Sequence, residues 1–247
     1  MLAVAYRRRT LPLAWSVHQG TKGNLSVNAY IALLERVYQM VPLGVEVHLA
    51  ADSGFASRDL FHWLHQHGWH YVIRDRGRVT FRPVGGKGWQ RIADLPLQPG
   101  QTRAIGWVYR AKTTPFGPLY LLLHWECGQD DPWFLFSDQP DVRYIRRTYK
   151  RRMWIEEMFG DMKDHGFDLE ATHLRRLERI QRLMLGVCMA YVWLVALGSW
   201  VIKNGHRHLI DRKDRRDKSY FRLGWDWLAH CDRLGLSPPD FWLKPYL

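Results

Sequence analysis

Cysteine is scarce in this chain, and the cysteines present are isolated. The 247 residues include three, Cys127, Cys188 and Cys231, and no two of them form a C-x-x-C motif. Zinc modules need clustered cysteines and disulfide frameworks need an even number, so the spacing argues against both. Three single thiols fit a reducing, cytoplasmic compartment, and we expect them to be buried and free.

A recognisable secretory signal is also lacking. The short apolar start of the chain runs directly into Arg7, Arg8 and Arg9, and no long apolar core follows these arginines. A signal peptide needs such a core, so we expect none here.

Long uncharged runs are nearly absent. Residues 183–202 form one, with twenty residues between Arg182 and Lys203, which is the length of a transmembrane helix. The run contains Gly186 and Gly198, no second run accompanies it, and a helix that is apolar all round can also be a core helix. We expect a core helix and no membrane; a membrane-associated protein anchored by residues 183–202 is the alternative.

Aromatic residues and positive charge, in contrast, are abundant. Hydrophobic residues make up 47% of the chain and aromatic residues 14%, including 13 tryptophans, which argues against disorder. Lysine and arginine exceed aspartate and glutamate by 36 to 24, which gives a net charge of +12 and a pI near 9.8. This surplus favours a polyanionic partner, nucleic acid first and an anionic membrane second.

A strand, a short helix and a second strand follow one another in the first third of the chain. They are expected at residues 45–51, 58–67 and 69–74, with Ser57 as the helix cap and Gly68 at the helix end. The two strands of such a βαβ unit are parallel neighbours. Asp52 lies just past the carboxyl end of the first strand, where open α/β sheets bind their ligands. An isolated Asp at this position can also be a simple turn former.

The other predicted elements lie on both sides of this unit. In chain order they are strands at 2–6 and 11–18, a helix at 26–40, a small antiparallel β region at 77–132, a strand at 133–138 that returns to the main sheet, a helix at 148–163, one long helix or a kinked pair at 174–202, and a short final helix with an extended tail.

The helix at 148–163 carries a polar stripe. At about 100° per residue, four of its side chains fall within an arc of roughly 60°: Tyr149, Arg152, Glu156 and Lys163. We expect this stripe to be exposed. The opposite side, expected to be buried, consists of Trp154, Ile155, Met158, Phe159 and Met162. A carboxylate that holds a metal ion, flanked by cations that hold phosphates, needs this arrangement; ordinary ion pairs on a solvated helix face are the alternative.

The spacing Tyr-x2-Arg-x3-Glu-x6-Lys in this helix resembles the signature of IS4-family transposases, within the larger DDE group. The segment HLAADSGF, residues 48–55, resembles the strand that delivers the second catalytic Asp in the same family. The two motifs stand in the family's order, and the resemblance covers most of the chain. It implies an α/β fold in which a ribonuclease-H-like mixed sheet is flanked by helices, with a β-rich insertion between the Asp and the Glu.

The resemblance also suggests a division of the chain. We expect the first part of a ribonuclease-H-like catalytic domain at residues 1–76, the β-rich insertion at 77–132, the second part of the catalytic domain with the Glu-bearing helix at 133–205, and a basic C-terminal extension at 206–247.

The implied activity is metal-dependent DNA strand cleavage and transfer at insertion-sequence ends. Asp52 and Glu156 would be ligands of two Mg²⁺ or Mn²⁺ ions about 3.5–4 Å apart. Arg152 and Lys163 would neutralise phosphates of the transposon ends, and Tyr149 would hydrogen-bond near them. The further DNA-binding candidates are Arg147, Lys150 and Arg151. The partners would be double-stranded DNA, both transposon ends and target, and a second copy of the chain in a homodimer at the prokaryotic nucleoid.

The chain departs from the family pattern in one respect. DDE enzymes need three carboxylates, and the sequence has no Asp before Asp52. Glu35 and Glu46, the acidic residues that do precede it, lie in a predicted helix and in the Asp52 strand, so neither replaces the first Asp. The chain thus resembles a transposase without its first strand, and we expect it alone to bind DNA but to cleave it poorly. A non-catalytic DNA-binding remnant is the alternative.

Overall fold

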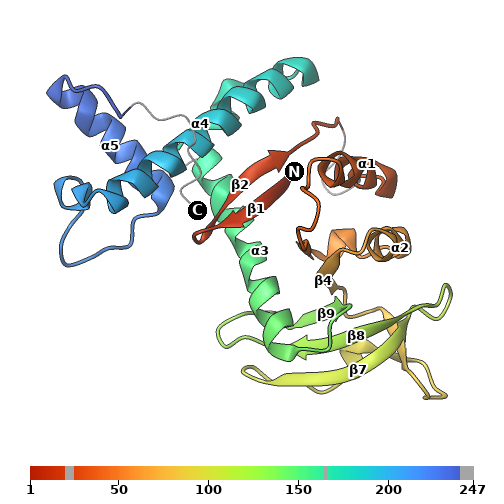
Figure 1. Ribbon diagram of the computed structural model, residues 1–247. Helices are drawn as coiled ribbons and strands as arrows, with labels where there is room; N and C mark the ends of the chain where they lie inside the picture. Colours follow the sequence, from red (N-terminus) through yellow and green to blue (C-terminus); the bar gives the residue numbers. More distant parts are fainter. Residues whose placement is uncertain (20–24, 164–165, 240–247) are drawn as a thin grey trace. The chain divides into compact units, whose positions relative to one another are not determined.

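The structure is a computed structural model that describes residues 1–19, 25–163 and 166–239 (Figure 1). The chain divides into two compact units, Gly20–Met153 and a second unit formed by Met1–Gln19 with Trp154–Leu247. The long helix α3 (Val142–Met162) contributes to both, and each unit is described by itself.

The unit at residues 20–153 is built on a seven-stranded mixed sheet. In the order of the sheet its strands are β3 (His48–Ala51), β4 (His70–Asp75), β9 (Trp133–Ser137), β8 (Phe116–His124), β7 (Thr102–Arg110), β5 (Thr80–Pro83) and β6 (Gln90–Arg91). The strands β3 and β4 are parallel and the other pairs are antiparallel. The predicted βαβ unit and the return of residues 133–138 to the main sheet are therefore confirmed.

Helices cover both faces of this sheet. On β4, Tyr71 contacts Phe61 of α2 (Arg58–Gln66), while the next residue, Val72, packs with Tyr149 of α3. Successive side chains of a strand point to opposite faces, so α2 and α3 lie on opposite sides. Covering on both faces explains why Tyr71, Val72 and Ile73 are all buried. Helix α1 (Val27–Tyr38) packs beside α2. The expected mixed α/β fold, a mixed sheet flanked by helices, is confirmed.

Local signals set the ends of α2 as the sequence predicts. The Ser57 hydroxyl accepts a hydrogen bond from the Leu60 amide at 3.3 Å, and Gly68 follows the helix with a φ of +63°. Two 3-10 turns complete this unit, η1 (Ser53–Phe55) and η2 (Ile92–Asp94).

The strands of residues 77–132 do form the predicted antiparallel region, but they continue the main sheet. Strand β9 pairs along its whole length with residues 120–124 of β8, and β7 and β5 extend the sheet beyond β8. The domain boundaries at residues 76, 132 and 205 stay predictions.

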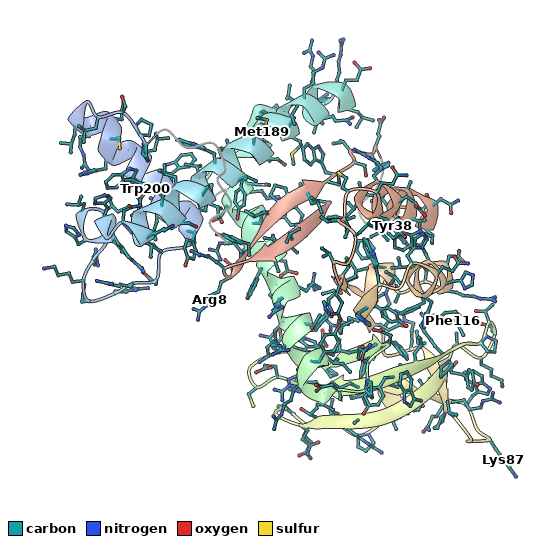
Figure 2. All side chains as sticks on the ribbon, viewed as in Figure 1. Arg8, Tyr38, Lys87, Phe116, Met189 and Trp200 are labelled. Atoms are coloured by element: carbon teal, nitrogen blue, oxygen red, sulfur yellow. The ribbon has the colours of Figure 1, made fainter. Side chains whose placement is uncertain are left out.

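The second unit contains a hairpin, the end of α3 and two further helices. Its strands β1 (Leu2–Tyr6) and β2 (Arg9–Ala14) pair antiparallel in a sheet of their own, with the exposed side chain of Arg8 at the turn (Figure 2). The helices are α4 (Leu177–Lys203) and α5 (Tyr220–Leu234), with short turns η3 (Leu169–Thr172) and η4 (His206–Leu209). The predicted final helix is α5, whereas residues 240–247 of the expected tail lie outside the described residues.

The apolar run at residues 183–202 lies within α4, which has the length and composition of a membrane span. Half of the most apolar 18-residue stretch of this helix is buried inside the protein. One side of α4 packs through Tyr191 and Leu194 with Met158 of α3, and Leu197 and Val201 pack on Trp227 of α5. This packing accounts for the apolar residues on the buried side of α4.

Two glycines let α4 and α5 approach closely. A Cβ atom on Gly198 would lie 1.8 Å from the Tyr220 carbonyl oxygen, and one on Gly224 would lie 1.9 Å from the Leu194 carbonyl oxygen. The helix backbones therefore meet at these two residues, where any side chain would collide.

Two of the three thiols are buried as expected. Cys188 and Cys231 are buried and free, whereas Cys127 is exposed. The expectation for Cys127 was wrong because this residue lies in the turn after β8, at the rim of the sheet.

Candidate functional site

Asp52 lies directly after the carboxyl end of β3, as the sequence predicts. Its Oδ1 atom accepts a hydrogen bond from the Ser53 amide at 2.7 Å, so Asp52 caps the short turn η1. Its side chain remains 44% exposed. Among the described strands, β3 pairs with β4 and forms the edge of the sheet. The carboxylate is thus fixed by the backbone and still open to a ligand.

Helix α3 brings a cation to this carboxylate. The Nη1 atom of Arg152 lies 4.0 Å from Oδ2 of Asp52, and the Arg152 side chain is only 16% exposed. The guanidinium also lies over the ring of Tyr149, 5.8 Å from its centroid. Asp52 of the strand-end motif therefore meets Arg152 and Tyr149 of the helix motif within the unit at residues 20–153.

Tyr149 adds a buried phenol to the same cluster. Its ring contacts Trp133 with centroids 5.0 Å apart, and its hydroxyl is buried without a hydrogen-bond partner among the described residues. Burial raises the pKa of Tyr149 above its ordinary value, against the opposing effect of the nearby Arg152 and Arg74 guanidiniums. The phenol therefore stays protonated at neutral pH and keeps a proton to donate.

The prediction that Tyr149 belongs to an exposed stripe was wrong, as was the predicted burial of Phe159. Tyr149 is 1% exposed and Phe159 is 37% exposed. The first half of α3 packs Ile145 and Tyr149 onto the sheet, whereas its second half buries Met158 and Met162. At about 100° per residue these two pairs lie on roughly opposite faces of the helix. A single amphipathic stripe cannot describe a helix that buries different faces along its length.

Sequence reasoning missed Arg110, which supports the turn after Asp52. Its Nε atom donates to the Asp75 carboxylate, and its Nη2 atom donates to the Ala56 carbonyl oxygen at 2.9 Å. Asp75 is 4% exposed, and burial raises its pKa although Arg110 opposes this effect. Arg110 thus ties strand β7 to the segment that carries Asp52. Its partner Ala56 is 54 positions away, so no local pattern could reveal the pair.

Glu156 and Lys163 belong to the other unit. Glu156 follows Arg152 by one helical turn on α3 and is exposed, and Lys163 is exposed just past the helix end. Nearby, the Arg9 guanidinium binds Asp161 at 3.2 Å and Glu157 at 3.3 Å, which fastens the hairpin to α3. Asp52 and Glu156 thus lie in different compact units.

The remaining predicted DNA contacts lie on the outer surface of α3. Arg147, Lys150 and Arg151 are all exposed. The Lys150 ammonium, however, binds the Glu126 carboxylate at 2.8 Å, and His124 contacts the same carboxylate at 2.9 Å. These hydrogen bonds, first that of Lys150 and then that of His124, lower the pKa of Glu126 to about 2. Glu126 is thus ionised at neutral pH and neutralises part of the basic surface.

The described residues supply only part of a metal site. Asp52 has the hard carboxylate oxygens that Mg²⁺ and Mn²⁺ prefer, but Ser53 and Arg152 face these oxygens. Within the described ranges, no group of three or more His, Cys, Asp or Glu side chains is placed to hold a metal ion. The two-metal site at Asp52 and Glu156 stays a prediction.

Comparison with known protein families identifies a match. Residues 2–193 fit the family model described as "Transposase DDE domain". The matched range contains both Asp52 and Glu156 and ends within α4. A search of the curated proteins found no match to the chain.

Proposed function

We propose, because this chain belongs to the transposase DDE domain family, that it acts on double-stranded DNA at the ends of an insertion sequence of the IS4 type. The family indicates DNA cleavage and strand transfer as the class of reaction. The homodimer in the DNA complex and the cytoplasmic, nucleoid-associated location are part of the same proposal.

The observation that carries the proposal is the meeting of Asp52 with Arg152 and Tyr149. The carboxylate at the end of β3 and the guanidinium on α3 are 4.0 Å apart, although a hundred residues separate them in the sequence. A simple turn-forming Asp would need no such cluster. The arrangement supports a site that binds a phosphodiester beside a carboxylate.

Each side chain of the cluster has a distinct task in this proposal. Arg152, already largely buried, binds a non-bridging phosphate oxygen through its planar guanidinium. Tyr149, protonated at neutral pH, donates its unpaired hydroxyl proton to the same phosphate group. Arg110 holds the Ala56 carbonyl and so keeps the Asp52 turn in place. Arg147, Arg151 and Lys163 bind the DNA backbone further along.

Transposase DDE domains generally use divalent metal ions. We propose that Asp52 and Glu156 provide carboxylate ligands for Mg²⁺ or Mn²⁺. Bound there, the ions would supply the chemistry of the two-metal class, activation of the attacking oxygen and stabilisation of the leaving oxygen.

The chain alone should bind DNA but cleave it poorly. The sequence has no Asp before Asp52, and the described residues provide no third ligand near it. A metal-dependent assay on a transposon-end duplex tests this, because robust strand cleavage by residues 1–247 would refute the idea that a ligand is missing.

Binding of a labelled duplex, followed by fluorescence anisotropy, tests the site itself. Replacing Arg152 with Ala should weaken binding by about tenfold, the effect of removing one charged hydrogen bond. The matched control is Arg58→Ala, an exposed arginine on α2, which should change binding by less than about twofold. A duplex affinity that is the same in Arg152→Ala and the original chain, with both folded by circular dichroism, would contradict the proposal.

A non-catalytic DNA-binding remnant remains the second candidate. The observation that favours it is the incomplete ligand set around Asp52. It predicts that divalent ions bind no differently when Asp52 or Glu156 is replaced.

A further inference from the structure

A cavity of about 650 Å³ lies in the C-terminal part of the chain, beyond the residues that match the family model. Its walls are the end of η4, the segment from Ile210 to Lys218, and Arg233 near the end of α5. This volume lies within the range of small-ligand sites, about 300–1,000 Å³. This segment belongs to the predicted basic C-terminal extension at residues 206–247.

Ion pairs hold the walls of the cavity, one of them formed by the buried carboxylate of Asp211. Asp211 has a side chain that is 2% exposed, and its Oδ2 atom accepts a hydrogen bond from Arg207 Nε at 2.6 Å. Lys218 donates to the Ile210 carbonyl oxygen and binds Asp226 at 2.9 Å. These interactions fasten both ends of the segment to η4 and α5, so its conformation is held by specific bonds and differs from that of a mobile, solvated tail.

The charges that line the cavity do not cancel. Arg212, Arg215, Lys218 and Arg233 face Asp211 and Asp217. Asp217 is paired with Arg215 at 2.6 Å, and Asp211 is paired with Arg207 and lies 4.0 Å from Lys218. Within the described ranges no carboxylate lies within 4.0 Å of Arg212 or Arg233, and both residues are exposed. Arg233 Nη2 lies 3.4 Å from the His230 ring nitrogen Nδ1, so neither guanidinium has a carboxylate counter-charge among the described residues, and both can bind an anion.

We propose that this cavity binds a phosphate group through Arg212 and Arg233. Guanidinium groups bind phosphate oxygens through two parallel hydrogen bonds, and a buried, neutralised Asp211 holds the wall without repelling the ligand. The phosphate can come from the backbone of duplex DNA, bound beyond the matched domain, or from a free phosphate compound. The assignment to duplex DNA rests on the proposed function, whereas the binding of phosphate itself does not.

The test uses the full chain and two double variants that remove equal charge. Arg212→Ala/Arg233→Ala removes the two arginines of the cavity that lack a carboxylate partner. Lys213→Ala/Arg216→Ala removes two exposed cations of the same segment that do not line the cavity. Inorganic phosphate is titrated by calorimetry, and a labelled duplex is titrated by anisotropy at several salt concentrations.

We expect the cavity variant to bind inorganic phosphate at least about tenfold more weakly, while the control variant binds it like the original chain. The slope of log affinity against log salt becomes shallower by about 0.9 for each DNA phosphate that the protein no longer neutralises. If DNA is the source of the phosphate, this change in slope should be larger in the cavity variant than in the control variant. An unchanged duplex slope together with weakened phosphate binding would assign the site to a free phosphate compound.

Equal phosphate binding in both variants, or no phosphate binding by the original chain, would overturn the proposal. If thermal melting shows that the alanine variant is unfolded, Arg212→Gln/Arg233→Gln replaces it. Glutamine removes the charge and keeps a polar side chain. A chain that binds phosphate but no duplex would leave the cavity assignment standing and would count against the proposed DNA function.

Discussion

At the scale of single residues, the candidate site is centred on Asp52 at a strand end and on the largely buried Arg152, whose guanidinium lies 4.0 Å from the carboxylate. Asp52 could be found because a predicted strand end and a local motif agreed on it. The burial of Tyr149 could not be predicted, since a helix wheel shows which residues share a face but not which face meets the sheet. The contact between Arg110 and Asp75 could not be predicted either, because it depends on the pairing of β7 with the rest of the sheet.

The Asp75–Arg110 pair gives the first prediction. Arg110→Met leaves the buried Asp75 carboxylate without its partner and should lower the free energy of unfolding by about 3–5 kcal/mol. The double variant Asp75→Leu/Arg110→Met removes both charges and should be destabilised far less. Urea unfolding measures both; equal destabilisation of the single and the double variant would show that the pair is not the cause.

Glu126 gives the second prediction. Its pKa in the folded chain is about 2, below the ordinary value of 4.5, so its ionised form stabilises the fold above about pH 4.5. This contribution should disappear as the pH falls from about 4.5 through about 2.

Thermal melting of Glu126→Gln against the original chain checks this: the difference in Tm present at pH 7 should vanish near pH 2. The variant should also bind duplex DNA about threefold more tightly, because Lys150 loses its counter-charge. Asp130→Asn, an exposed carboxylate in the same loop, serves as the control. A Tm difference for Glu126→Gln that persists at pH 2 would contradict the explanation.

At the scale of elements, periodicity and caps predicted most helices and strands to within a few residues. Ser57 and Gly68 marked α2 because cap chemistry is local. Strand β3 is shorter than expected, His48–Ala51 in place of 45–51, and α3 starts six residues earlier than residue 148, at Val142. Tertiary pairing decides how far these elements extend, and a single sequence does not contain it.

The crossing of α4 and α5 gives the third prediction. Gly198→Ala places a methyl group against the Tyr220 carbonyl oxygen, and the helices must separate, at a cost of about 1–3 kcal/mol or more. Gly186→Ala in the same helix meets no atom within 4 Å and should stabilise the chain by about 0.5–1 kcal/mol. Chemical unfolding of both variants measures the difference; a Gly198→Ala chain as stable as Gly186→Ala would contradict the close crossing.

At the scale of the whole molecule, the net charge of +12 favours a polyanionic partner. The sequence left α4 open to two interpretations, because a core helix and a membrane span share the same composition. Its packing against α3 and α5 could be seen only in the folded chain.

The fourth prediction follows from this packing. After cell lysis the chain should appear in the soluble extract without detergent, since half of the most apolar 18-residue stretch of α4 is already buried in the protein. Ultracentrifugation at high salt, which releases proteins held on membranes by charge alone, checks this. Recovery of the chain only in detergent would favour an anchor at residues 183–202.

Binding of Mn²⁺ to the full chain with a duplex, followed by electron paramagnetic resonance, tests directly whether Asp52 is a metal ligand. If it is, Asp52→Asn should weaken Mn²⁺ binding by about tenfold or more, since a carboxylate ligand is removed. Asp59→Asn, an exposed aspartate in the first turn of α2, should bind Mn²⁺ as the original chain does. Equal Mn²⁺ affinity in Asp52→Asn and the original chain would contradict the assignment of Asp52 to the metal site.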